Sequence, residues 1–228
     1  MAAARAETPR ERYRAQVRAE ITQRAWEQIA TAGASALSLN AIAKQMGMSG
    51  PALYRYFAGR DELITELVRE AYRSLADTLR TAAATGSTAP DTGRPRLTAL
   101  AYALRGWALA DPHRYFLIYG TPVPGYRAPQ DTTAISNEIM TTLLDACAAS
   151  PALAPDGTAT PLRTHLADHR DWAAGHPAGP GELHRFLIFW TRLHGVLSLE
   201  LAGQFTGMDF DPALLFAAEL DALLPPGS

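Results

Sequence analysis

The stretch from Ser38 to Arg60 gathers side chains that could contact nucleic acid. Ser38 and Ser49 each stand where a helix N-cap belongs, and Gly47 suits the left-handed residue that ends a helix. Two short helices joined at a glycine turn form a helix-turn-helix, whose second helix enters a major groove. We expect that second helix over 50–57. The outward side chains that could read base edges are Gly50, Pro51, Ala52, Tyr54 and Arg55, with Tyr56 near the edge.

Apolar residues at helical spacing should hold these two helices together. Leu53 and Phe57, four positions apart, would pack inward from the second helix. The inner face of the first helix consists of Leu39, Ile42, Ala43 and Met46. The same spacing is compatible with an ordinary corner between two helices of an all-α protein. The flanks favour the DNA-binding alternative, because a long helical pattern precedes the motif and another follows it.

Together with its flanks, this region resembles the TetR family of bacterial transcriptional regulators. The turn after the second helix reads LYRYF-x-x-R-D-E-L and enters the next long helix. The matching positions span about the first third of the chain: Leu39, Ile42, Ala43, Gly47, Leu53, Tyr54, Tyr56, Phe57, Arg60 and Leu63. The resemblance implies a three-helix helix-turn-helix domain followed by a helical domain that binds a small-molecule effector and dimerises.

The resemblance also implies roles for single residues. The expected phosphate contacts come from the Ser38 backbone, Asn40, Lys44 and Arg60, where helix N-termini favour the anion. Tyr54 and Tyr56 would give their hydroxyls to phosphate or their ring faces to thymine methyl groups. Base reading falls to Ser49, Gly50, Ala52, Tyr54 and Arg55. Arg55 is the long donor of that set and arginine pairs best with guanine, although a phosphate contact is the open alternative.

Helical patterns continue to the end of the chain, and no alternating strand pattern appears. Beside the motif, helices are expected at about 9–31, 60–83, 96–110, 111–118, 129–149, 160–173, 181–204 and 211–224. The fold is therefore predicted to be all-α, with about nine to ten helices. Residues 84–95 are rich in Gly, Pro, Ser and Thr. We expect a helix-turn-helix domain over 1–84 and a regulatory ligand-binding and dimerisation domain over 85–228.

Composition narrows the class of protein. The formal net charge is −2, but residues 1–85 carry net +3 and residues 86–228 net −5, which suits an N-terminal domain that approaches phosphates. No apolar run approaches the roughly 20 residues of a membrane span, and the N-terminus lacks the apolar core of a signal peptide. Cys147 is the single cysteine, so no disulfide within the chain is possible. A cytoplasmic location is expected.

The expected helix over 181–204 is apolar on nearly every side. A helix of this kind must be buried all round, so one side should face its own domain and another a second subunit. With the helix over 211–224 from each of two chains, a four-helix homodimer interface is expected. Residues 96–210 also resemble a TetR-family C-terminal domain with a Trp-His-Gly (WHG) signature, here Trp190, His194 and Gly195.

Aromatic side chains are dense in the same half of the chain. A helical bundle of this kind can enclose an apolar pocket with a few polar groups. His194, Arg105 and Asn137 are the polar candidates for such a pocket. The alternative is that these side chains form the ordinary core. The residues expected to bind an apolar or aromatic effector are Trp107, Phe116, Tyr119, Phe186, Trp190 and His194.

No motif indicates catalysis. His165 and His169 lie four apart and could share a helix face, but no HExxH pattern accompanies them, so a solvated helix is expected and no metal site or cofactor. The predicted function is a ligand-responsive regulator, most simply a repressor, that binds a palindromic operator as a homodimer. The alternatives are a transcriptional activator, or a helical ligand-binding or scaffolding protein with only non-specific DNA affinity.

Overall fold

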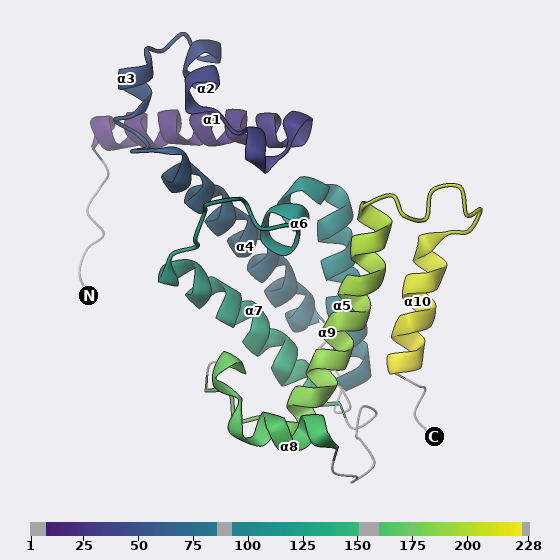
Figure 1. Cartoon of the computed structure of the whole chain (residues 1–228). Coiled ribbons are helices and arrows are strands. Elements are labelled where there is room, and N and C mark those ends of the chain that lie inside the picture. Colours follow the sequence, from purple (N-terminus) through teal and green to yellow (C-terminus); the bar gives the residue numbers. More distant parts are fainter. Residues whose placement is uncertain (1–7, 86–92, 151–159, 174, 225–228) are drawn as a thin grey trace. The chain divides into compact units, whose positions relative to one another are not determined.

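The computed structural model describes residues 8–85, 93–150, 160–173 and 175–224. Within these ranges it contains ten α-helices, two 3₁₀ helices and no strand, which confirms the predicted all-α fold. Figure 1 shows α2 and α3 near α1, and α9 beside α10 at the C-terminal end of the chain. None of the helices among the described residues has both the length and the apolar composition that crossing a membrane requires.

The N-terminal elements follow the sequence pattern closely. They are α1 (Pro9–Ala32), the 3₁₀ helix η1 (Ala34–Ala36), α2 (Leu39–Gln45), α3 (Gly50–Leu53) and α4 (Arg60–Thr85). α1 begins with a capping box, in which the Thr8 hydroxyl accepts from the Glu11 amide and the Glu11 carboxylate accepts from the Thr8 amide. α1 ends where Gly33 adopts a positive φ of 78°, a backbone conformation that favours glycine.

The remaining elements also lie near their predicted positions. They are α5 (Gly93–Ala110), α6 (Pro112–Tyr119), α7 (Gln130–Ala148), α8 (Pro161–Asp168), the 3₁₀ helix η3 (Asp171–Ala173), α9 (Pro180–Leu201) and α10 (Pro212–Leu223). The joint predicted at 84–95 falls largely on residues outside the described ranges. Thr160 and Asp211 cap α8 and α10, each followed by proline at the first helical position, as expected.

Two predicted helices are shorter than expected. The helix expected over 50–57 ends at Leu53, because the next amides bond three residues back: Arg55 N lies 3.3 Å from Ala52 O, and Tyr56 N lies 2.8 Å from Leu53 O. The helix expected over 160–173 ends at Asp168, where His169 leaves the helical region with φ −120° and ψ 68°. A short 3₁₀ turn, η3, then follows.

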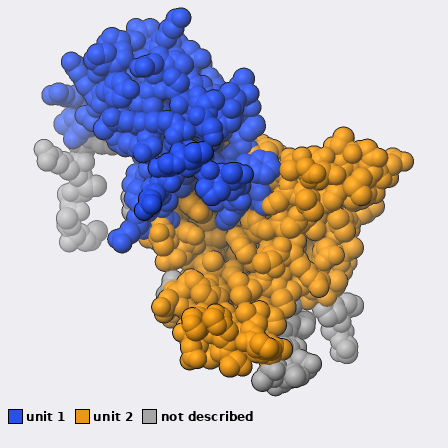
Figure 2. Space-filling model, viewed as in Figure 1, with its two compact units in different colours: residues 1–71, 113–132 blue, residues 72–112, 133–228 orange. Residues whose placement is uncertain are grey.

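Contacts divide the chain into two compact units (Figure 2). Unit 1 comprises residues 1–71 and 113–132, and unit 2 comprises residues 72–112 and 133–228. α4, α6 and α7 therefore contribute residues to both units, α6 only through Pro112. The predicted domain boundary at residue 84 stays a prediction.

Each unit has its own apolar core. In unit 1 the core joins α1, α2, α3 and the first half of α4, through Ile21, Ile42, Leu53, Phe57 and Leu67, all inaccessible to solvent. In unit 2 the buried side chains of α5, α7, α9 and α10 form the core, among them Leu100, Leu144, Leu193 and Phe216. Burying such large apolar side chains is the main source of stability in both units.

Candidate nucleic-acid interface

The corner between α2 and α3 is held by the two predicted caps. The Ser38 hydroxyl accepts from the Ala41 amide at 3.3 Å, and the Ser49 hydroxyl accepts from the Ala52 amide at 3.4 Å. Between the caps, Gly47 has φ 65°, which confirms its predicted role in ending α2. The geometry is that of a helix-turn-helix with a short second helix.

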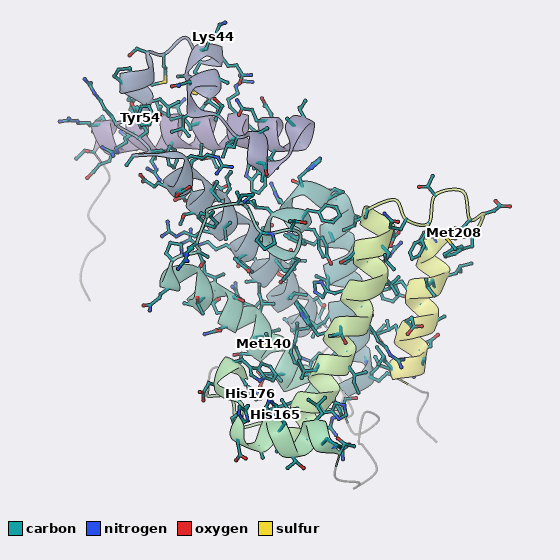
Figure 3. All side chains as sticks on the ribbon, viewed as in Figure 1. Lys44, Tyr54, Met140, His165, His176 and Met208 are labelled. Carbon is teal, nitrogen blue, oxygen red and sulfur yellow. The ribbon has the colours of Figure 1, made fainter. Side chains whose placement is uncertain are left out.

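The predicted DNA-contacting residues lie on the outer surface of this corner. Tyr54 is 47% exposed, and Figure 3 places Lys44 at α2 and Tyr54 beside α3. Asn40, Ser49 and Arg55 are also exposed. The half-buried members of the set are Ser38, Gly50, Ala52, Tyr56 and Arg60. This surface offers amide, hydroxyl, phenol, ammonium and guanidinium donors, which are the groups that proteins use toward phosphates and base edges.

Gly50 allows the two helices of the corner to approach closely. A Cβ atom at this position would lie 3.4 Å from the Asn40 Oδ1 atom, a tight contact. A larger side chain at Gly50 would therefore press on the Asn40 amide. The close approach of Gly50 to DNA stays a prediction.

Two arginines of α1, which the sequence motif did not reveal, hold the turn after α3. Arg18 Nη1 donates to the Tyr56 carbonyl, and its Nη2 lies 3.3 Å from the Glu66 carboxylate. The same guanidinium lies 4.0 Å from the centroid of the Phe57 ring. Arg14 Nη2 donates to the Arg55 carbonyl at 3.2 Å. The four-residue spacing of these arginines on one helix face was the available signal.

The start of α2 is also held from outside the motif. The Gln28 side chain accepts from the Ser38 amide at 3.0 Å and donates to the Ser38 carbonyl at 3.5 Å. Arg60 Nη2 donates to the Ala34 carbonyl at 3.0 Å and lies 3.3 Å from the Ser35 carbonyl. These contacts give Arg60 a structural task at η1, and its phosphate contact stays a prediction.

The six residues expected to bind an effector are divided between the two units. Phe116 and Tyr119 belong to unit 1, whereas Trp107, Phe186, Trp190 and His194 belong to unit 2. Trp107 is buried and its indole N–H donates to the Ser74 hydroxyl at 3.1 Å. The aromatic side chains of α9 stack along the helix, with ring centroids 6.0 Å apart for Phe186 and Trp190 and 3.9 Å apart for Trp190 and His194.

Burial sets the protonation of two groups in unit 2. It lowers the pKa of His194 to about 4, because the imidazolium would lose its hydration there. The ring beside Trp190 is therefore neutral at neutral pH. Burial likewise raises the pKa of the Cys147 thiol to about 12, so this cysteine is a packing residue and a poor nucleophile.

A cavity of about 400 Å³ lies within unit 1, between the end of α1, η1, α6 and the segment after α6. Phe116 is the member of the predicted effector set that lines it. Other lining residues are Ile29, Ser35, Leu117, Thr121 and Val123. Its size falls in the range of pockets that hold drug-sized molecules, and its lining mixes apolar surface with a few hydroxyl groups.

Arg105, a polar candidate for the effector site, is engaged by its own unit. It forms a bidentate salt bridge with the Glu200 carboxylate, in which Nε donates to Oε2 at 3.3 Å and Nη2 donates to Oε1 at 2.5 Å. The guanidinium also lies 5.6 Å from the centroid of the Phe216 ring. The pair ties α5 to α9 and directs the Nε and Nη2 donors toward Glu200.

The histidines around α8 pack with one another and with α7. The His165 and His169 rings stack at 3.9 Å, with 11° between their planes. His176 Nε2 lies 3.0 Å from Asp145 Oδ1, and its Nδ1 accepts from the Ala178 amide. Among the residues that the structure describes, no three histidine, cysteine or acidic side chains come together as metal ligands would.

Comparison with known proteins covers both halves of the chain. The family of bacterial regulatory proteins called the tetR family matches residues 21–67, and the tetracyclin repressor-like C-terminal domain matches residues 97–223. The HTH-type transcriptional regulators Rv1816 of Mycobacterium tuberculosis and Mb1846 of Mycobacterium bovis are each 37% identical over 219 residues, which is 92% of this chain and of the relative.

Solved structures share the fold. The crystal structure of SCO4313 is 68% identical, with a TM-score of 0.84, over 96% of this chain and all of that one. A TetR-family regulator from Bordetella parapertussis is 19% identical, with a TM-score of 0.57, over 92% of this chain and 94% of that one. At that identity, the second similarity concerns the fold alone.

Proposed function

The chain belongs to the tetR family of transcriptional regulators, with its helix-turn-helix DNA-binding domain, and from this premise we propose that it is an effector-responsive repressor. The observation that carries the proposal is the polar outer surface of α2 and α3. Exposed donors such as Lys44, Tyr54 and Arg55 stand on a corner that buries Ile42, Leu53 and Phe57 completely. Phosphate and base contacts would give these exposed donors their acceptors.

A homodimer is the second part of the proposal, and Gly195 on α9 supports it. This glycine is exposed, and a Cβ atom at its position would meet nothing within 4 Å. A glycine inside a helix costs roughly 0.5–1 kcal/mol relative to alanine. Close approach of a helix from a second copy would offset that cost.

Exposed apolar residues extend the same face. Ile188 and Leu199 lie seven positions before and four positions after Gly195, and both are exposed. On α10, which packs against α9, Leu214 is 69% exposed. The sequence pattern predicted burial of α9 on all sides, and a second copy seated here would complete that burial.

A two-fold dimer would read two related half-sites, so the operator should be partly palindromic. For the effector, we propose the cavity of unit 1 at Phe116, because its walls include η1, which leads directly into Ser38 and α2. An effector that binds better to the DNA-free arrangement weakens operator binding by the same factor. The other five predicted effector contacts stay predictions.

Selection of random duplex DNA by the purified protein tests the proposal. At near-physiological salt, the protein should recover a two-fold symmetric site. Ala52→Glu, which places a negative charge on the half-buried surface of α3, should recover none while remaining helical by circular dichroism. If the folded wild-type protein binds with a steep salt dependence but selects no sequence, the alternative of a non-specific binder replaces the regulator.

The dimer has its own test. Gly195→Leu should convert the dimer to a monomer in sedimentation equilibrium, because the added side chain separates the helices. Gly106→Leu is the matched control: Gly106 lies in α5, is exposed, and a Cβ atom at its position would likewise meet no neighbour within 4 Å. If both variants stay equally dimeric, the dimer interface does not include the face of α9 around Gly195.

The direction of regulation is tested by transcription from a promoter that carries the selected site. A repressor should lower transcript yield in a purified system, and the effector should restore it. A rise in transcript yield on adding the protein would establish the activator alternative.

A further inference from the structure

The 3₁₀ helix η1 borders two cavities of unit 1, each of about 400 Å³. Ala34 and Ser35 line the cavity at Phe116. Ala36 and Ser38 line the second cavity, whose other walls come from the end of α1 and from α2. None of the three residues of η1 is buried. An element that borders two cavities and buries no side chain can shift at a low cost in packing.

Two connections join η1 to the predicted DNA-binding surface. Arg60 Nη2 donates to the Ala34 carbonyl at 3.0 Å and lies 3.3 Å from the Ser35 carbonyl. At the other end of η1, the buried residue Leu37 leads directly into Ser38, the N-cap of α2. The Arg60 side chain and the Ser38 backbone are both predicted to contact phosphate. A shift of η1 would therefore move two phosphate contacts at once.

The Arg60 side chain can hold η1 and a phosphate together. A guanidinium has five N–H donors, so contacts through Nη2 leave donors for a phosphate oxygen. The guanidinium is planar and rigid, which fixes the direction of these donors relative to η1. If η1 shifts, the donors that face the phosphate turn with it.

We propose that η1 is the element that moves when the cavity at Phe116 is filled, and that Arg60 transmits this movement to the DNA-binding surface. The inference rests on the proposed function, because it names how the same cavity would regulate operator binding. Arg60 is a positioning residue in this scheme, since it acts by joining the cavity wall to the phosphate contacts. An occupant that displaces Ala34 and Ser35 would weaken operator binding.

A substitution that fills the cavity takes the place of the effector in the test. Thr121 is exposed and lines the cavity, so Thr121→Phe adds an aromatic ring there and leaves the sequence of η1 unchanged. Affinity for the selected operator should fall by about 5- to 150-fold, the usual range for coupling between two sites. Thr141→Phe is the matched control, because Thr141 is exposed on α7 and lines neither cavity. This control should stay within about twofold of wild type.

A double-mutant cycle tests the role of Arg60. Arg60→Met removes a phosphate contact and should weaken operator binding by itself. In the Arg60→Met background, the loss of affinity caused by Thr121→Phe should be at least about threefold smaller than in the wild-type background. If Arg60 only contacts phosphate, the two losses should multiply, and that result would overturn its assignment. Circular dichroism checks that each variant keeps its helices.

Hydrogen exchange in the free protein tests the same movement without DNA. The Ser38 amide donates to Gln28 Oε1 at 3.0 Å. Thr121→Phe should lower the protection of this amide at least about threefold, and Thr141→Phe should leave it unchanged. Unchanged protection or full operator affinity in folded Thr121→Phe would overturn the proposal. A protein that selects no operator would refute the proposed function instead, and the exchange result would still decide whether η1 moves.

Discussion

The ion pairs of Arg18 in unit 1 and of Arg105 in unit 2 lie in different surroundings. In unit 1, Arg18 contacts the Glu62 and Glu66 carboxylates, and all three side chains are at least 26% exposed. In unit 2, the Arg105 and Glu200 side chains are 16% and 12% exposed. Water solvates the charges of the Arg18 cluster, whereas in the Arg105–Glu200 pair each charge depends on its partner.

This difference in exposure distinguishes polar residues that position an exposed surface from polar residues that are enclosed. The polar groups of unit 1 position an exposed surface, so changing them should alter DNA binding more than stability. The Arg105–Glu200 pair of unit 2 is enclosed, so changing it should alter stability first. Substitutions in both units test that separation, from the largest expected effect to the smallest.

Arg105→Ala should lower the free energy of unfolding by about 3–5 kcal/mol, because it leaves the Glu200 carboxylate buried and unpaired. Urea unfolding measures this change. Arg18→Ala is the comparison and should cost clearly less, since Glu62 and Glu66 remain hydrated. Equal losses in the two variants would remove the distinction between the units.

The double variant Arg105→Met with Glu200→Leu sharpens this prediction. Replacing a buried ion pair by apolar side chains of similar volume is often neutral or stabilising. The double variant should therefore recover most of the stability that Arg105→Ala loses. If it stays as unstable as the single variant, the pair contributes through geometry that apolar packing cannot replace.

His194 should make unit 2 sensitive to acid. Its folded-state pKa of about 4 lies below the unfolded value of about 6.5, so the unfolded state binds the proton more readily. The contribution of His194 to the free energy of unfolding is fully present above about pH 6.5. It decreases by about 3 kcal/mol as the pH falls to 4. Unfolding measured across this range should show a weaker decrease for His194→Phe, and parallel curves would contradict the assignment.

Arg55→Ala should lower affinity for the selected operator by about 1–3 kcal/mol and relax preference at one symmetric pair of bases. Lys44→Ala is the matched control, because loss of a phosphate contact weakens binding to all DNA sequences alike. It should also reduce the slope of log K against log salt concentration by about 1. Binding to operator and scrambled duplexes measures both. If Arg55→Ala weakens both duplexes equally, the arginine contacts phosphate instead.

Ser49→Ala should cost about 1 kcal/mol of stability, because the Ala52 amide loses its side-chain acceptor. Ser35→Ala, at an exposed position in η1, should stay within about 0.5 kcal/mol of wild type. Thermal unfolding compares the two variants. A silent Ser49→Ala would mean that water caps α3 as well as the hydroxyl does.

The sequence predicted those parts of the fold that depend on local chemistry. Caps at Ser38 and Ser49, the turn at Gly47 and the proline-led starts of α8 and α10 need only a few neighbouring residues. The contraction of α3 was missed because it depends on tertiary contacts. Arg14 and Arg18 of α1 hold the Arg55 and Tyr56 carbonyls in the turn that replaces the predicted helical end.

The candidate effector site was the hardest part to predict. Helical spacing places Phe186, Trp190 and His194 on one side of α9, and the structure stacks them along that helix. Spacing cannot tell such a stack from a pocket lining, since both require large apolar side chains. The cavity at Phe116 depends instead on how η1, α6 and residues 121–124 come together, which no local pattern encodes.

Two copies of this chain should read one operator, and the proposed function depends on that stoichiometry. Sedimentation equilibrium of the protein with the selected duplex, at near-physiological salt, tests it directly. The expected mass is that of two chains on one duplex, with no such complex on a scrambled duplex of equal length. A complex of one chain with the selected duplex, or equal binding to the scrambled one, would contradict the proposal.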